Sequence, residues 1–105
     1  HQSRTRQQQA QVTLTQTQRQ VLGNVYSMYN EALTARTIAD RLQHTAELAA
    51  ESLRLTTLRY EAGESTALEV VDAQNTLVAA RDAADDARTR YRVAIADLQT
   101  VTGPF

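Results

Sequence analysis

The feature that most constrains this chain is a heptad pattern that runs along nearly all of it and is interrupted once. Over residues 4–61, small or apolar side chains recur at alternating steps of three and four, the spacing of a coiled-coil seam. They are Leu14, Val21, Val25, Met28, Ala32, Ala35, Ala39, Leu42, Ala46, Ala49 and Leu53. A helix of this length extends roughly 85 Å at ~1.5 Å per residue. Only Gly23-Asn24 offers a candidate break. Because Gly inside a helix costs only about 1 kcal/mol relative to Ala, we expect the helix to continue there.

A second seam of the same period follows over residues 66–102. Its members are Val70, Ala73, Leu77, Ala80, Ala84, Ala87, Tyr91, Ala94, Leu98 and Val101. Two seams of matching period joined by a short turn at residues 62–65 predict antiparallel helices. The whole chain, residues 1–105, is therefore expected to be an all-α, long antiparallel coiled-coil hairpin. Because the second helix is shorter, the N-terminal end of the first should project beyond it.

The turn has the residues that such a hairpin needs. Gly63 suits the left-handed position that ends a helix. Thr66 is a favoured N-cap, and Glu69 three residues later completes the sequence signature of a capping box. Gly103 and Pro104 supply a comparable stop at the end of the second helix.

Both helices also carry apolar residues away from their seams. These are Leu22, Tyr29, Leu33, Ile38, Leu48, Leu55 and Leu58 on the first helix, and Leu68, Val71, Val78 and Ile95 on the second. A single hairpin cannot cover two apolar faces. The pattern indicates association with more helices, in a homo-oligomer or in a larger parent chain. The N-terminal sequence resembles the end of a fragment, so we expect this chain to be a segment excised from a longer protein.

Composition argues against several classes of function. The formal charge of −1 gives no overall electrostatic attraction for nucleic acid. The absence of Cys excludes disulfides and thiolate metal sites. His44 with Glu47 and Glu51 forms at most a weak surface metal site, and a solvated His is the favoured interpretation. No phosphate-binding loop or Ser/His/Asp arrangement is present, so we expect no enzyme, no cofactor and no metal. No window is apolar enough to span a bilayer.

Charged residues gather in two places. Glu61, Glu64, Glu69 and Asp72 surround the turn. They form either a negatively charged docking surface or pore mouth, or an ordinary solvated helix end. In the second helix, Arg81 with Asp85 and Asp86 with Arg90 are spaced for ion pairs along an outer face.

The residues around the turn resemble the outer membrane efflux protein family, the TolC-like channels. The resemblance lies in Arg59-Tyr60-x-x-Gly63-x-Ser65-Thr66-x-Leu68-Glu69-Val70-Val71-Asp72-Ala73-Gln74, followed by Leu77, Ala80, Ala87, Tyr91, Ala94, Leu98 and Gly103. It implies a homotrimeric channel in the outer membrane of a Gram-negative bacterium. This chain would be one periplasmic hairpin of its α-barrel, with residues 4–61 descending and residues 66–102 returning.

The resemblance also implies roles for individual residues. Ala62, Gly63 and Glu64 would meet the periplasmic adaptor (membrane fusion) protein, which connects the channel to an inner-membrane pump. The charge of Glu64 departs from the small or apolar residue common there in the family. Glu69 and Asp72 would form acidic rings that constrict the pore, and the spacing of this pair is similar to that in the C-terminal repeat of the family. Tyr60 would help to latch neighbouring helices, while Ser65 stands where some members have a latching Arg.

The function implied is that of a passive exit duct in efflux or type I secretion. One alternative is the hairpin of the adaptor protein itself, which Leu53-Arg54-Leu55-Thr56 superficially suggests but the Gly63 turn and Asp72-Ala73-Gln74 do not. Another is a cytoplasmic scaffolding or signalling coiled coil. Strands before residue 1 and a second hairpin in the full-length gene would support the channel.

Overall fold

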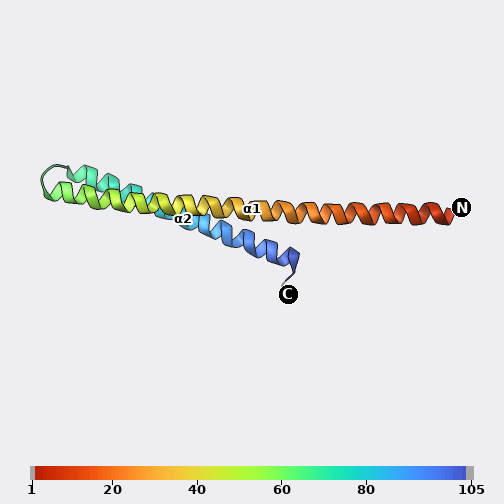
Figure 1. Ribbon diagram of the computed structural model, residues 1–105. Helices are drawn as coiled ribbons and strands as arrows, with labels where there is room; N and C mark the ends of the chain where they lie inside the picture. The colour runs from red at the N-terminus through yellow and green to blue at the C-terminus, as the bar shows by residue number, and fades with distance from the viewer. Residues whose placement is uncertain (1, 104–105) are drawn as a thin grey trace.

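Two α-helices and the turn between them make up the part of the chain that the structure, a computed structural model, describes: residues 2–103. Helix α1 spans Gln2–Glu61 and helix α2 spans Ala67–Thr102. The two helices lie antiparallel, with the turn at one end and the free end of α1 at the other (Figure 1). No strand occurs within residues 2–103. The prediction of an all-α helical hairpin is confirmed. His1 and Pro104 lie outside the described residues.

The hairpin is long and narrow, with extents of 92 × 24 × 13 Å and a radius of gyration of 25.1 Å. Helix α1 passes through Gly23 without a break. The space around Gly23 is open, since a Cβ added there would have no neighbour within 4 Å. A helical Gly with no steric demand weakens α1 without bending it.

Helix α1 ends in a Schellman motif. The Gly63 N–H donates to the Tyr60 carbonyl at 3.0 Å, and the Glu64 N–H donates to the Arg59 carbonyl at 2.7 Å. Gly63 has a φ of +78°, the left-handed conformation that this motif requires. The motif satisfies carbonyl groups that would otherwise lack partners at the helix end.

Thr66 caps the start of helix α2, and its side-chain oxygen accepts a hydrogen bond from the Glu69 N–H at 3.2 Å. The reciprocal bond of a capping box is not formed here. The Glu69 carboxylate instead accepts a hydrogen bond from the Ser65 hydroxyl, a donor that the box signature does not include. Gly103 caps the end of helix α2: it has a φ of +94° and donates its N–H to the Gln99 carbonyl at 3.0 Å.

The core of the hairpin is a line of small side chains between the helices. Its buried members are Ala32, Ala46, Ala49, Leu77, Ala84 and Ala87, all on the predicted seams. The other seam residues from Val25 to Leu53 and from Val70 to Leu98 are half-buried. Because Ala leaves little volume between the helix axes, the two backbones approach closely along this line.

The seam of α1 continues beyond the reach of α2. Leu14 and Val21 occupy seam positions but remain more than half exposed, because α2 ends before it reaches them. Val101, at the last seam position of α2, is also exposed, and Figure 1 shows this end of α2 diverging from α1. The N-terminal part of α1 therefore projects alone.

Candidate functional site at the hairpin tip

The tip, residues 59–72, brings together every residue for which the sequence predicts a role. Ala62, Gly63 and Glu64 form the exposed turn. Tyr60 is about half exposed, at 47 %. The Arg59 guanidinium donates to the Glu64 carbonyl at 3.3 Å and so adds a side-chain contact across the turn. This contact replaces the apolar one that often accompanies a Schellman motif.

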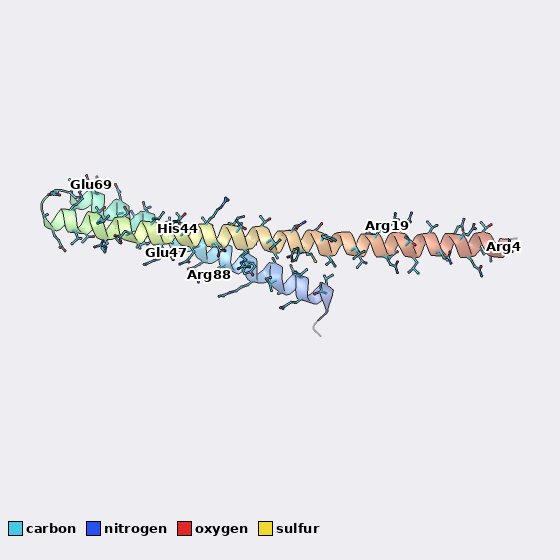
Figure 2. The ribbon with its side chains drawn as sticks, viewed as in Figure 1. Arg4, Arg19, His44, Glu47, Glu69 and Arg88 are labelled. Atoms are coloured by element: carbon cyan, nitrogen blue, oxygen red, sulfur yellow. The ribbon has the colours of Figure 1, made fainter. Side chains whose placement is uncertain are left out.

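Glu69 and Asp72 lie in the first turns of α2, and both are exposed. Glu69 is held by two contacts, since its backbone N–H donates to Thr66 and its carboxylate accepts from Ser65. Figure 2 shows Glu69 beside the turn. Placing a carboxylate near a helix N-terminus is favourable, because the N-terminal N–H groups carry partial positive charge.

The acidic side chains at the tip form no ion pair. Among the described residues, the carboxylates of Glu61, Glu64 and Asp72 have no hydrogen-bond or ion-pair partner. Three negative charges thus remain free at one end of the molecule. The sequence identified these charges, but it did not predict the hydrogen bond of Ser65 to Glu69 or the contact of Arg59 with the Glu64 carbonyl.

His44 lies far from the tip on an exposed surface of α1 (Figure 2). Its Nδ1 is 3.9 Å from the Glu47 carboxylate, and both side chains are exposed. Glu51 instead pairs with Arg54 at 2.6 Å. The hydrogen bond and charge of Arg54 lower the pKa of Glu51 below 4.5. No group of three potential metal ligands occurs in residues 2–103.

The outer charges of α2 pair differently from the sequence expectation. Neither Arg81 with Asp85 nor Asp86 with Arg90 forms an ion pair. Arg88 lies 3.8 Å from Asp85 and donates to the Gln43 side chain of α1 at 2.6 Å. Arg88 lies beside the seam, so the α1 residue that faces it determines its hydrogen-bond partner. A comparison of flanking positions on both helices would have identified this contact.

A groove of about 680 Å³ lies between the helices midway along the hairpin. Ala35, Ile38 and Leu42 contribute apolar surface to it, and Glu31, Asp86 and Arg90 contribute charge. Within the described residues, neither helix contains a stretch apolar and long enough to cross a bilayer.

The geometry defines a class of structural element. A narrow two-helix hairpin with a small-residue seam, uncovered apolar sides and a charged tip is typical of a part of a larger helical assembly.

Comparison with protein families extends this definition. The sequence model of the family described as "Outer membrane efflux protein" matches residues 1–104. The chain belongs to the outer membrane efflux protein family, and the predicted resemblance is confirmed. Searches of curated proteins and of solved structures returned no match for the chain. Its family is one of transport, and the hairpin is a component of an outer-membrane efflux protein.

Proposed function

We propose that this hairpin forms part of the periplasmic wall of a homotrimeric outer-membrane efflux channel. The observation that supports this most directly is the family match, which covers nearly the whole chain. The hydrogen-bonded turn at the tip and its free acidic side chains are consistent with it. In this role the protein performs no chemistry. It provides a duct for substrates delivered by an inner-membrane pump through a periplasmic adaptor.

The exposed turn is the proposed adaptor-docking surface. Ala62 and Gly63 present little side chain, so a partner can approach the backbone closely. Glu64 adds a negative charge that a cationic group on the adaptor tip would complement. Because the Schellman motif and the Arg59 contact order this turn, docking would require little reorganisation of the backbone.

Glu69 and Asp72 are the proposed pore constriction. Three copies around a threefold axis would place six carboxylates near the closed end of the duct, which would favour cations and repel anions. Tyr60, the second-last residue of α1, is the proposed latch to a neighbouring helix. Opening would separate the tips and increase the distance between these carboxylates.

The pore constriction is tested by changing Glu69→Gln and Asp72→Asn in the full-length channel that contains this hairpin. The amide of Gln still accepts the Ser65 hydrogen bond, so the turn should be preserved. We expect a higher closed-state conductance and a loss of cation selectivity in planar bilayers. Asp40→Asn, an exposed carboxylate away from the tip, is the control. Unchanged conductance and selectivity in the double variant would rule out the constriction.

The docking surface is tested by cross-linking. The Glu64→Cys variant should cross-link to the adaptor in the assembled complex. The Asp40→Cys variant, which changes a residue away from the tip, should not. Equal yields from both positions, or none from Glu64, would contradict docking at the turn. The family match favours the channel over an adaptor hairpin or a cytoplasmic scaffold.

A further inference from the structure

The seam between the helices is lined by its smallest side chains in the middle of the hairpin. Ala46 of α1 and Ala84 and Ala87 of α2 are buried there. Along α2, larger seam residues follow in both directions, with Leu77 on the side of the turn and Tyr91 on the other side. Because the distance between packed helices depends on the size of the side chains at the contact, the helix axes are closest at the alanines.

The helices cross at this alanine contact. In Figure 1, α2 lies on one side of α1 near the turn and emerges on the other side in the second half of its length. The burial of Ala84 and Ala87 shows that the helices touch in this region. Two helices that meet at small side chains and diverge towards one end can rotate about the contact, while the turn at Gly63 joins them at the other end.

A side-chain hydrogen bond joins the helices beside the crossing. The Arg88 Nη2 donates to the Gln43 Oε1 at 2.6 Å, and Arg88 also lies 3.8 Å from Asp85 of its own helix. Figure 2 shows Arg88 near the crossing. Hydrogen bonds to a charged group are stronger than those between neutral groups. Within residues 8–103, every other side-chain hydrogen bond and ion pair lies inside one helix or at the turn.

This bond ties the helices on one side of the seam only. Gln43 and Arg88 line a groove of about 290 Å³ on that side. The other side has the wider groove of about 680 Å³, which Ile38 of α1 lines together with Asp86 and Arg90 of α2. Within residues 8–103, no side-chain hydrogen bond or ion pair crosses the wider groove. The two helices are therefore fastened along one side of the seam and free along the other.

We infer that the alanine contact and the Arg88–Gln43 bond form a one-sided pivot, about which the C-terminal arm of α2, residues 91–102, moves relative to α1. The movement changes the width of the larger groove and leaves the tip unchanged, because the turn and the pivot hold the helices together between them. Arg88 is a positioning residue in this device. The inference does not rest on the proposed function, since the pivot belongs to a single hairpin.

The test measures distances between pairs of spin labels in the 105-residue chain. The chain has no Cys, so two introduced Cys residues are labelled selectively. Thr37→Cys with Ala96→Cys reports on the arm, and Ser52→Cys with Asn75→Cys reports on the tip side of the pivot; all four positions are exposed. An excess of unlabelled chain restricts the signal to distances within one molecule. The arm distribution should be at least about twofold broader than the tip distribution, because local stability differs along the hairpin.

Removing the bond tests the role of Arg88. Gln43→Ala and Arg88→Ala should each broaden the arm distribution further and leave the tip distribution unchanged. The two changes together should have no more effect than either alone, because each removes the same hydrogen bond. Gln74→Ala, which changes an exposed glutamine of α2 outside the contact, is the matched control and should alter neither distribution. Circular dichroism should show the same helix content in all variants.

Four results would overturn the inference. These are an arm distribution as narrow as that of the tip, an arm distribution that Gln43→Ala does not change, equal broadening of both distributions, and a loss of helix content in Gln43→Ala. The last two would mean that the bond supports the whole hairpin and does not define a pivot. The proposed function fails separately, in the conductance and adaptor cross-linking of the full-length channel.

Discussion

Gly63 and Gly23 are both surrounded by open space, yet their backbones differ. Gly63 has a φ of +78°, whereas Gly23 lies within α1. A Cβ added at either position would have no neighbour within 4 Å, so sterics from neighbouring residues do not distinguish them. Backbone conformation alone decides what a substitution does at each place.

We therefore expect the same substitution to have opposite effects at the two glycines. Gly63→Ala should destabilise the hairpin by about 1 kcal/mol, because an L side chain is disfavoured in the left-handed region. Gly23→Ala should raise the stability of α1 by about 0.5–1 kcal/mol, because Ala has the higher helix propensity. Urea denaturation and helical circular dichroism measure both changes. Shifts of the same sign would contradict this account.

Glu51 and Arg54 give a prediction on pH. The hydrogen bond from Arg54 lowers the pKa of Glu51 below the ordinary value of a glutamate carboxyl group. The pair therefore stabilises the helix above that value, and its contribution is lost as the pH falls through the lower folded pKa. Both side chains are exposed, so the effect on stability should be small.

Carboxyl-carbon NMR titration measures the pKa of Glu51 directly. Arg54→Ala should return this pKa towards the ordinary value of a glutamate carboxyl group, whereas Arg59→Ala should not, because Arg59 contacts the Glu64 carbonyl. A Glu51 pKa that is unaffected by Arg54→Ala would show that the hydrogen bond does not form in solution.

At the scale of the helices, the alanine seam sets how closely α1 and α2 approach. Ala84 is 3 % exposed, the most buried side chain of the core. Enlarging this side chain would push the helices apart, whereas the same change on the outer side of α2 would meet only solvent.

We expect Ala84→Leu to destabilise the hairpin by about 1–3 kcal/mol through overpacking. Ala79→Leu, at an exposed position of the same helix, should change the free energy of unfolding by less than about 0.5 kcal/mol. Thermal and urea denaturation of the two variants provide the comparison. Equal effects would mean that the helices are not in close contact at Ala84.

The sequence pattern identified the seam well and the polar contacts less well. All six buried residues lie on the predicted seams. Ile95, which the pattern placed off the seam, is half-buried, because it lies next to the seam residue Ala94. The contact of Arg88 with Gln43 was missed because it depends on which residues of α1 lie opposite it.

At the scale of the whole molecule, the part of α1 before Val25 projects without a partner helix. Its exposed apolar residues include Leu14, Val21 and Leu22. A single helix has little stability in water without tertiary contacts. This part of the hairpin should therefore be the least stable in isolation.

Hydrogen exchange tests this difference along α1. Backbone amides of residues 8–20 should exchange at least about tenfold faster than those of residues 32–53, the part of α1 that contains its buried seam residues. The comparison is internal to one helix, so intrinsic exchange rates are the only correction needed. Uniform protection along α1 of the isolated hairpin would contradict this prediction.

The amino-acid sequence by itself determined the helices, the turn at Gly63 and the two seams, because these depend on local propensity, capping and the period of apolar residues. It also determined that the hairpin has uncovered apolar sides. Only the tertiary structure decided which polar groups meet, such as Ser65 with Glu69 and Arg88 with Gln43. Those contacts depend on side-chain direction and on the relative position of two helices, which no periodicity along one chain specifies.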